Sequence, residues 1–262
     1  MVHVFFERSW VRFEADETLA RWVAAALPAA RAAVLDPLNA RWLRCGGTWF
    51  AGVNVLGNDA TGAVAGGPPL QGAAVDFIAG ELGLSGISWD SGQVSVCYPG
   101  YPRPSAEETP AAFRYRLEND AAHIDGIARD GPERRRFVRE HHGFILGLPL
   151  STVSAGASPL VVWEGSHEIV RAELRDRLAG IELAAWRDID ITDTYAALRR
   201  RVRAECRRVL VPAIPGEAYV LHRLAMHGVS PWQEDATAGP DGRMIAYFRP
   251  ELPGPADWLD RP

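Results

Sequence analysis

The sequence predicts a mainly β protein, a sandwich or barrel with flanking helices packed on its outside. From about residue 110 onward, short apolar runs are separated by turn residues, which is typical of such folds. Helical patterns gather in the first hundred residues, and two more interrupt the later runs. The 262 residues are enough to bury a sizeable core. We expect a single domain over 1–262, in which residues 1–109 buttress a β core at 110–250.

In the first hundred residues the sequence predicts two helices and two strands. Asp16 fits the N-cap of the first helix, and Pro28 is expected to break or restart it. The second helix follows Pro69 and ends near Gly83. The apolar stripes of these helices are Leu19, Trp22, Val23 and Ala26 in the first and Leu70, Ala74, Phe77 and Ile78 in the second. The strands are expected over residues 48–56 and 93–98.

Beyond residue 110, apolar runs predict a series of strands. Residues 113–117 alternate with a period of two, which suits a half-buried strand. Further strands are expected at 123–127, 142–151, 159–163, 209–214, 217–221, 225–229 and 243–248. Ser166 and Asp193 fit the N-caps of two intervening helices. The uncharged run over 144–163 contains prolines and glycines, so we expect two core strands there rather than a membrane helix.

Composition excludes several classes of function. The formal net charge of −5 disfavours a general nucleic-acid or anionic-membrane surface. All 28 basic residues are arginine, which excludes pyridoxal-phosphate Schiff bases, Walker-type phosphate loops and kinase active sites, since each needs a lysine. Cys45, Cys97 and Cys206 are odd in number and far apart, so we expect reduced thiols and a cytoplasmic protein. Glu7 and Arg8 stand where a signal peptide would need its apolar core.

His123 and Asp125 form the strongest candidate metal site in the sequence. On a strand, residues i and i+2 project to the same face, so both side chains can reach one ion. His227 is the best third ligand, because two imidazoles and one carboxylate with open positions make the facial triad of non-haem Fe(II) oxygenases. His222 is the rival, although a strand would turn it to the opposite face unless a bulge intervenes.

Four segments, in order, resemble the phytanoyl-CoA dioxygenase family of Fe(II)/2-oxoglutarate-dependent oxygenases. Residues 158–167, SPLVVWEGSH, are similar to the family's Asn-Gly-Pro-Leu … Pro-Gly-Ser-His segment. His123-Ile124-Asp125 precedes them at the place of the family's HxD motif. Residues 216–228 resemble the strand pair that carries the distal histidine, and residues 242–248 resemble the last core strand. The resemblance covers roughly residues 110–250.

This resemblance implies a double-stranded β-helix core, the jelly-roll, cupin-like fold, in an enzyme that uses Fe(II) and 2-oxoglutarate. It implies His123, Asp125 and His227 as metal ligands, Arg243 as the arginine that binds 2-oxoglutarate, and Ser230 as a hydroxyl beside that cosubstrate. O2 and a small organic molecule would be the other partners, and succinate and CO2 would be released. Asp125 stands where related halogenases have a small residue, so hydroxylation is expected rather than halogenation. Desaturation and ring closure stay open.

Arg243 also draws attention without the resemblance. It starts a strand that is apolar on both sides, where an unpaired guanidinium is costly and needs an anionic partner. Arg249, at the far end of that strand, is the rival. The arginines at 134–136 are expected to be a solvated surface, with attraction of an anionic substrate as the alternative.

Two other functions remain compatible with the sequence. One is a cupin-like metal enzyme that does not use 2-oxoglutarate, and the other is a non-catalytic jelly-roll binding protein. The arginines at 199–208 are expected to form the solvated face of a helix rather than a nucleic-acid site.

Overall fold

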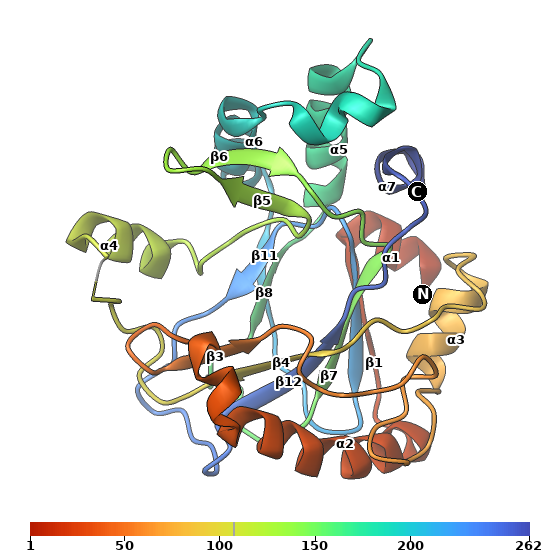
Figure 1. The fold of residues 1–262 in the computed structure, drawn as a ribbon, viewed down its shortest axis with the longest axis vertical. Coiled ribbons are helices and arrows are strands. Elements are labelled where there is room, and N and C mark those ends of the chain that lie inside the picture. Colours follow the sequence, from red (N-terminus) through yellow and green to blue (C-terminus); the bar gives the residue numbers. More distant parts are fainter. Residues whose placement is uncertain (107) are drawn as a thin grey trace.

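A computed structural model describes residues 1–106 and 108–262 and contains two facing antiparallel sheets (Figure 1). Within these residues, the larger sheet has the order β1 (Trp10–Phe13), β10 (Ala218–His222), β7 (Phe144–Pro149), β12 (Arg243–Phe248), β4 (Gln93–Cys97), β3 (Trp49–Gly52) and β2 (Leu43–Arg44). The smaller sheet has the order β11 (His227–Val229), β8 (Leu160–Trp163) and β9 (Arg208–Val211). A separate hairpin pairs β5 (Ile127–Asp130) with β6 (Arg135–Val138). The predicted jelly-roll fold class is confirmed.

Helices cover the outer faces of both sheets. The α-helices are α1 (Val2–Arg8), α2 (Glu17–Leu35), α3 (Ala73–Gly80), α4 (Pro110–Glu118), α5 (Ser166–Leu178), α6 (Thr192–Glu205) and α7 (Pro255–Asp260). Two 3₁₀ helices are η1 (Pro37–Trp42) and η2 (Leu183–Asp188). The first three α-helices pack on the larger sheet, and α5 and α6 pack beside the smaller sheet (Figure 1).

This arrangement produces three apolar layers, and β7 contributes side chains to two of them. Leu146 and Leu148 point outward into the layer shared with the N-terminal helices. Ile145 points inward, where it meets Val162 of β8 and Ile245 of β12 between the sheets. Because both faces of the central strands are covered, they are apolar on both sides. The inner layer forms the wall of the functional site.

The first hundred residues contribute strands to the larger sheet as well as helices to its outside. β1 pairs with β10, and β4 pairs with β12 from Arg243↔Cys97 to Tyr247↔Gln93. The N-terminal region therefore extends the sheet on both sides of the strands that the resemblance covers. The uncharged run after residue 143 forms β7 and β8, as predicted.

The helix α2 begins as the sequence predicts but continues through Pro28. The Asp16 carboxylate accepts a hydrogen bond from the Leu19 amide at 2.7 Å, which caps the helix. The prediction that Pro28 breaks the helix is wrong, because Pro28 lies on the exposed side and packing of Trp22 and Ala30 holds both halves. By length and composition alone α2 could cross a membrane, yet its Trp22 side lies fully buried in the core.

Four other local predictions are corrected. Residues 113–117 belong to the helix α4, whose N-cap Thr109 accepts from the Ala112 amide at 3.2 Å. Segment 123–127 is no continuous strand, because His123 forms one isolated bridge and β5 begins at its end. Gly165 and Ile191 take the N-cap positions predicted for Ser166 and Asp193.

Candidate metal centre

His123 and His227 are brought together by a single antiparallel bridge. The His123 amide donates to the His227 carbonyl at 2.8 Å, and the His227 amide donates to the His123 carbonyl at 3.0 Å. Residues paired in this way project to the same face of the ladder. The two imidazole ring centroids therefore lie 4.5 Å apart, at the start of β11.

Asp125 completes a group of three possible ligand atoms. Its Oδ1 lies 3.2 Å from Nε2 of His123 and 3.8 Å from Nε2 of His227. One ligand atom from each residue lies within 4.8 Å of the others. The structure thus places together the three residues that the sequence predicts as metal ligands.

The ring nitrogens are oriented so that both imidazoles present a free lone pair to this point. His123 Nδ1 lies 3.2 Å from the Ala121 carbonyl, and His227 Nδ1 lies 3.0 Å from the Ala225 carbonyl. A carbonyl only accepts, so each Nδ1 carries a proton in these contacts, and Nε2 of a neutral ring is then the nitrogen that can bind a metal. Burial, with the nearby His123, lowers the pKa of His227 to about 4, which keeps it neutral at pH 7. Two imidazoles and a carboxylate converge at one point, and this donor set fits Fe(II).

Arg249 holds the other oxygen of Asp125. Its Nη1 donates to Asp125 Oδ2 at 3.2 Å, and its Nη2 donates to the side chain of Gln93. The Arg249 amide donates to both oxygens of Asp90, at 3.0 and 3.2 Å. Burial raises the pKa of Asp125, but the charge of Arg249 and the His227 ring outweigh it and hold that pKa well below the ordinary value. From the sequence, Arg249 was expected only as a rival for binding a cosubstrate, and this positioning role was not predicted.

A cavity of about 280 Å³ opens over the three ligands. Its walls include Ile145 and Leu160 from the facing sheets, and Trp42 and Trp49 from the N-terminal region. Tyr247 also lines it. The first hundred residues therefore form part of the wall beside the candidate metal centre.

Arg243 is buried in the barrel, and its guanidinium lacks an anionic partner among the residues that the structure describes. Its side chain is 4% exposed, and Nη1 has no hydrogen-bond acceptor within the described chain. Nη2 lies 3.4 Å from the Tyr247 hydroxyl. A second cavity of about 210 Å³ is lined by Arg243 and Tyr219. An unpaired buried guanidinium fits one carboxylate of an acid that enters the barrel.

Two tyrosines that the sequence analysis missed lie between these cavities. Tyr219 and Tyr247 are both register partners of Gly147 on the strand between them, and their hydroxyls are 2.9 Å apart. A Cβ atom at position 147 would lie 2.0 Å from Tyr219 Cε2, so only glycine leaves room for this pair. The glycine inside an apolar strand was the available signal, because such a glycine often marks a close approach.

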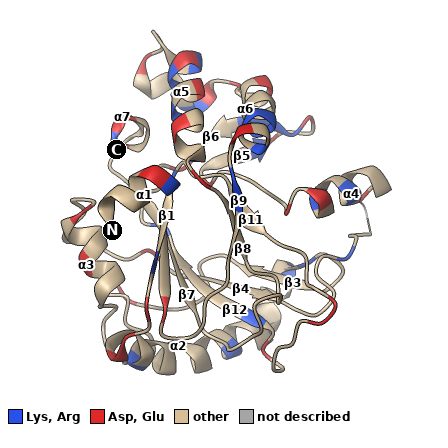
Figure 2. Ribbon diagram, turned by 180° about the vertical axis from the view of Figure 1, so that it is seen from behind, with Lys and Arg blue, Asp and Glu red and all other residues tan. Residues whose placement is uncertain are grey.

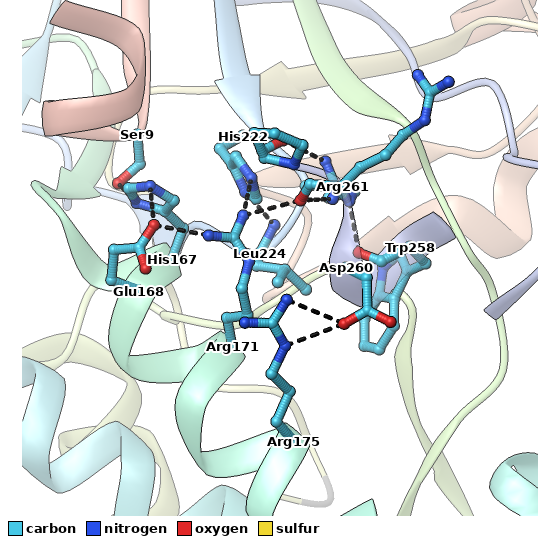
Figure 3. Close-up of polar contacts among 12 residues, drawn as sticks. Ser9, His167, Glu168, Arg171, Arg175, His222, Leu224, Trp258, Asp260 and Arg261 are labelled. Atoms are coloured by element: carbon cyan, nitrogen blue, oxygen red, sulfur yellow. Dashed lines mark hydrogen bonds and ion pairs between the residues drawn. The ribbon is translucent and has the colours of Figure 1, made fainter. Parts of the chain in front are cut away.

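The remaining predicted residues lie elsewhere. Ser230 is buried just beyond β11, where its amide donates to the Pro159 carbonyl at 3.0 Å, and it is not among the described residues that line either cavity. His222 lies at the end of β10, where it contacts Arg171 and His167 (Figure 3). Its Nδ1 accepts from the Leu224 amide at 3.0 Å, so the structure gives the rival histidine a position away from Asp125.

Comparisons with known proteins support the fold. No protein-family model matches the chain, and no curated protein does. Among solved structures, it is similar to SnoK, a non-heme alpha ketoglutarate dependent carbocyclase from nogalamycin biosynthesis, with a TM-score of 0.50 and 14% identity over 98% of this chain and 87% of SnoK. It is also similar to EvdMO1, with a TM-score of 0.51 and 16% identity over 97% of this chain. The match spans about half, 49%, of the EvdMO1 chain.

Proposed function

We propose that this protein is an Fe(II)- and 2-oxoglutarate-dependent dioxygenase that hydroxylates a small organic molecule and releases succinate and CO2. One observation carries the proposal: His123, Asp125 and His227 turn lone pairs to one point of a jelly-roll barrel. The buried, unpaired Arg243 in the same barrel supports a dicarboxylate cosubstrate. SnoK, which shares the fold, depends on alpha ketoglutarate.

The chain's own residues have distinct roles in this proposal. His123, Asp125 and His227 would hold the iron and leave positions for 2-oxoglutarate and O2, and the iron would supply the oxidative chemistry. Arg249 keeps Asp125 ionised and fixes which of its oxygens faces the metal. Arg243 binds the carboxylate of 2-oxoglutarate that lies far from iron, beside the paired tyrosine hydroxyls.

The outcome proposed for the substrate is hydroxylation. Asp125 occupies the ligand position that chloride needs in a halogenase, and Arg249 anchors it there. Ile145 and Leu160 give the cavity beside the ligands an apolar wall. A chlorinated product formed in the presence of chloride would contradict this proposal.

Turnover of 2-oxoglutarate tests the proposal before the substrate is known. Purified protein loaded with Fe(II) should convert 2-oxoglutarate and O2 slowly to succinate and CO2, and Asp125→Ala should abolish this activity. His3→Ala, at an exposed histidine in α1, is the matched control and should retain it. Iron binding without succinate formation would favour a cupin-like enzyme that does not use 2-oxoglutarate, and absence of iron binding would favour a non-catalytic jelly roll.

A further inference from the structure

A separate cavity of about 690 Å³ lies beside the candidate metal centre. Ala121 and Ala122 line this cavity, and the next residue, His123, lines the pocket over the metal ligands. Its other walls come from α4, the β5–β6 hairpin and α6. A volume of this size accommodates a small organic molecule.

Four arginine side chains, from α4, the β5–β6 hairpin and α6, line this cavity. They are Arg116 from α4, Arg129 from β5, Arg134 from the turn that follows, and Arg199 from α6. Figure 2 shows basic residues gathered on α6. Arg116 pairs with Glu108, with Nε 3.0 Å from Oε1. Within residues 1–106 and 108–262 the other three form no ion pair, although the charge of Arg134, after the hydrogen bond from Arg116, also helps to lower the pKa of Glu108.

Two arginines of α6 lie over aromatic rings, and some of their N–H groups have no hydrogen-bond acceptor within the described part of the chain. The Arg199 guanidinium lies 5.6 Å from the ring centre of Tyr115 and 5.4 Å from that of Tyr195, and Arg203 lies 5.6 Å from Tyr115. Nε of Arg199 and Nη1 of Arg203 are buried and have no acceptor within the described part of the chain. Buried donors of this kind are costly unless an acceptor reaches them.

Positive charges are crowded around Arg129, which is itself an exposed residue. Loss of hydration, together with the charges of Arg136 and Arg134, lowers the pKa of Arg129 to about 10. Loss of hydration also lowers the pKa of Arg136, which lies over the Tyr195 ring at 4.8 Å. An anion in the cavity would relieve this repulsion, because it would supply both charge and acceptors.

We propose that this cavity binds the doubly charged oxyanion of a phosphate ester, carried by the small molecule whose carbon is oxidised at the adjacent metal centre. The second half of this statement rests on the proposed function. Guanidinium groups bind phosphate oxygens through paired hydrogen bonds. A group with two negative charges can interact with several arginines at once. The site is a cavity lined by the ring of Tyr115 and placed beside His123, which favours a small molecule over an extended nucleic acid.

Calorimetric titration of the metal-free full chain with phenyl phosphate tests the anion site. Saturable binding is expected, with benzoate and phenol binding at least tenfold more weakly. Arg129→Gln and Arg199→Gln should each weaken phenyl phosphate binding at least tenfold. The matched control is Arg201→Gln, on the same helix, because Arg201 is paired with Glu173 and Glu205 at 2.9 Å each and should leave the affinity unchanged.

The outcomes separate this proposal from the proposed function. Absence of saturable binding, equal binding of benzoate, or an equal effect of Arg201→Gln would overturn the anion site. Phenyl phosphate binding in a protein that never consumes 2-oxoglutarate would leave the anion site intact and refute the oxygenase. To test the link between the sites, Mn(II) in the metal centre should enhance ³¹P relaxation of bound phenyl phosphate in the wild type but not in His227→Ala. Equal relaxation in both would show that the bound phosphate is remote from the metal.

Discussion

Replacing Gly147 with alanine would place a methyl group where the ring of Tyr219 lies. The new Cβ would be 2.0 Å from Cε2 and 2.3 Å from Cζ of that ring, whereas carbon atoms pack at about 3.5–4.0 Å. Tyr219 is completely buried, so its ring must shift and lose the 2.9 Å hydrogen bond to Tyr247. Overpacking costs about 1–3 kcal/mol and a lost hydrogen bond about 1 kcal/mol. Alanine also restricts the unfolded chain more than glycine does, which offsets about 0.4–1 kcal/mol of this loss of stability.

The expected net loss is therefore about 2 kcal/mol, or about 4 °C in Tm for a chain of this size. Thermal and urea unfolding of the metal-free protein measure it, with Gly239→Ala as the control because a Cβ there meets nothing within 4 Å. Adding Tyr219→Phe keeps the clashing ring and should recover only the hydrogen bond that both changes remove, about 1 kcal/mol relative to additivity. Adding Tyr219→Leu also removes the clashing atoms and should recover at least about 2 kcal/mol. Full stability of Gly147→Ala, or additive effects with Tyr219→Leu, would refute the packing argument.

Two further predictions concern Arg243 and His167. Arg243→Ala should retain Fe(II) but lose about 2–5 kcal/mol of binding free energy for 2-oxoglutarate in anaerobic titrations, and an unchanged affinity would contradict its assigned role. Burial lowers the pKa of His167 from 6.5 to about 4, so below about pH 6.5 the unfolded chain takes up a proton that the folded chain refuses. Stability is therefore lost as the pH falls from about 6.5 to 4. His167→Gln should remove about 2 kcal/mol of the loss measured between pH 7 and pH 5 by urea unfolding of metal-free protein, and parallel curves for variant and wild type would count against this cause.

The three candidate metal ligands could be predicted because their signals are local. His123 and Asp125 are two residues apart, and His227 lies in a short segment with a familiar pattern. The structure brings these atoms together through one bridge, although it does not form the continuous strand that was expected. A spacing of two residues was enough to place both side chains on one side without a full ladder.

The supporting residues could not be predicted, because they depend on the register between strands that are distant in sequence. Tyr219, Gly147 and Tyr247 become neighbours only when β10, β7 and β12 pair in one alignment. Arg249 donates to Asp125 although the two residues are far apart in the sequence, and no local pattern around either one predicts this contact.

The helix α4 shows the opposite failure, in which a local pattern misled. Five alternating residues at 113–117 fit a strand by period alone. Thr109 at the N-cap and Pro110 at the first helical position were the stronger signal, and they indicate a helix. Tyr115 is exposed, so the alternating apolar residues do not face a core as those of a half-buried strand would.

The most direct test of the central claim is the Fe(II) content of anaerobically loaded protein, measured after removal of free metal. One Fe(II) per chain is expected in the wild type and in His222→Gln, which alters the rival histidine beside Arg171. The ion should be lost in His227→Ala, with circular dichroism confirming that the variant is folded. Retention of iron by His227→Ala, or its loss from a folded His222→Gln, would contradict the assignment of His123, Asp125 and His227 as the metal centre.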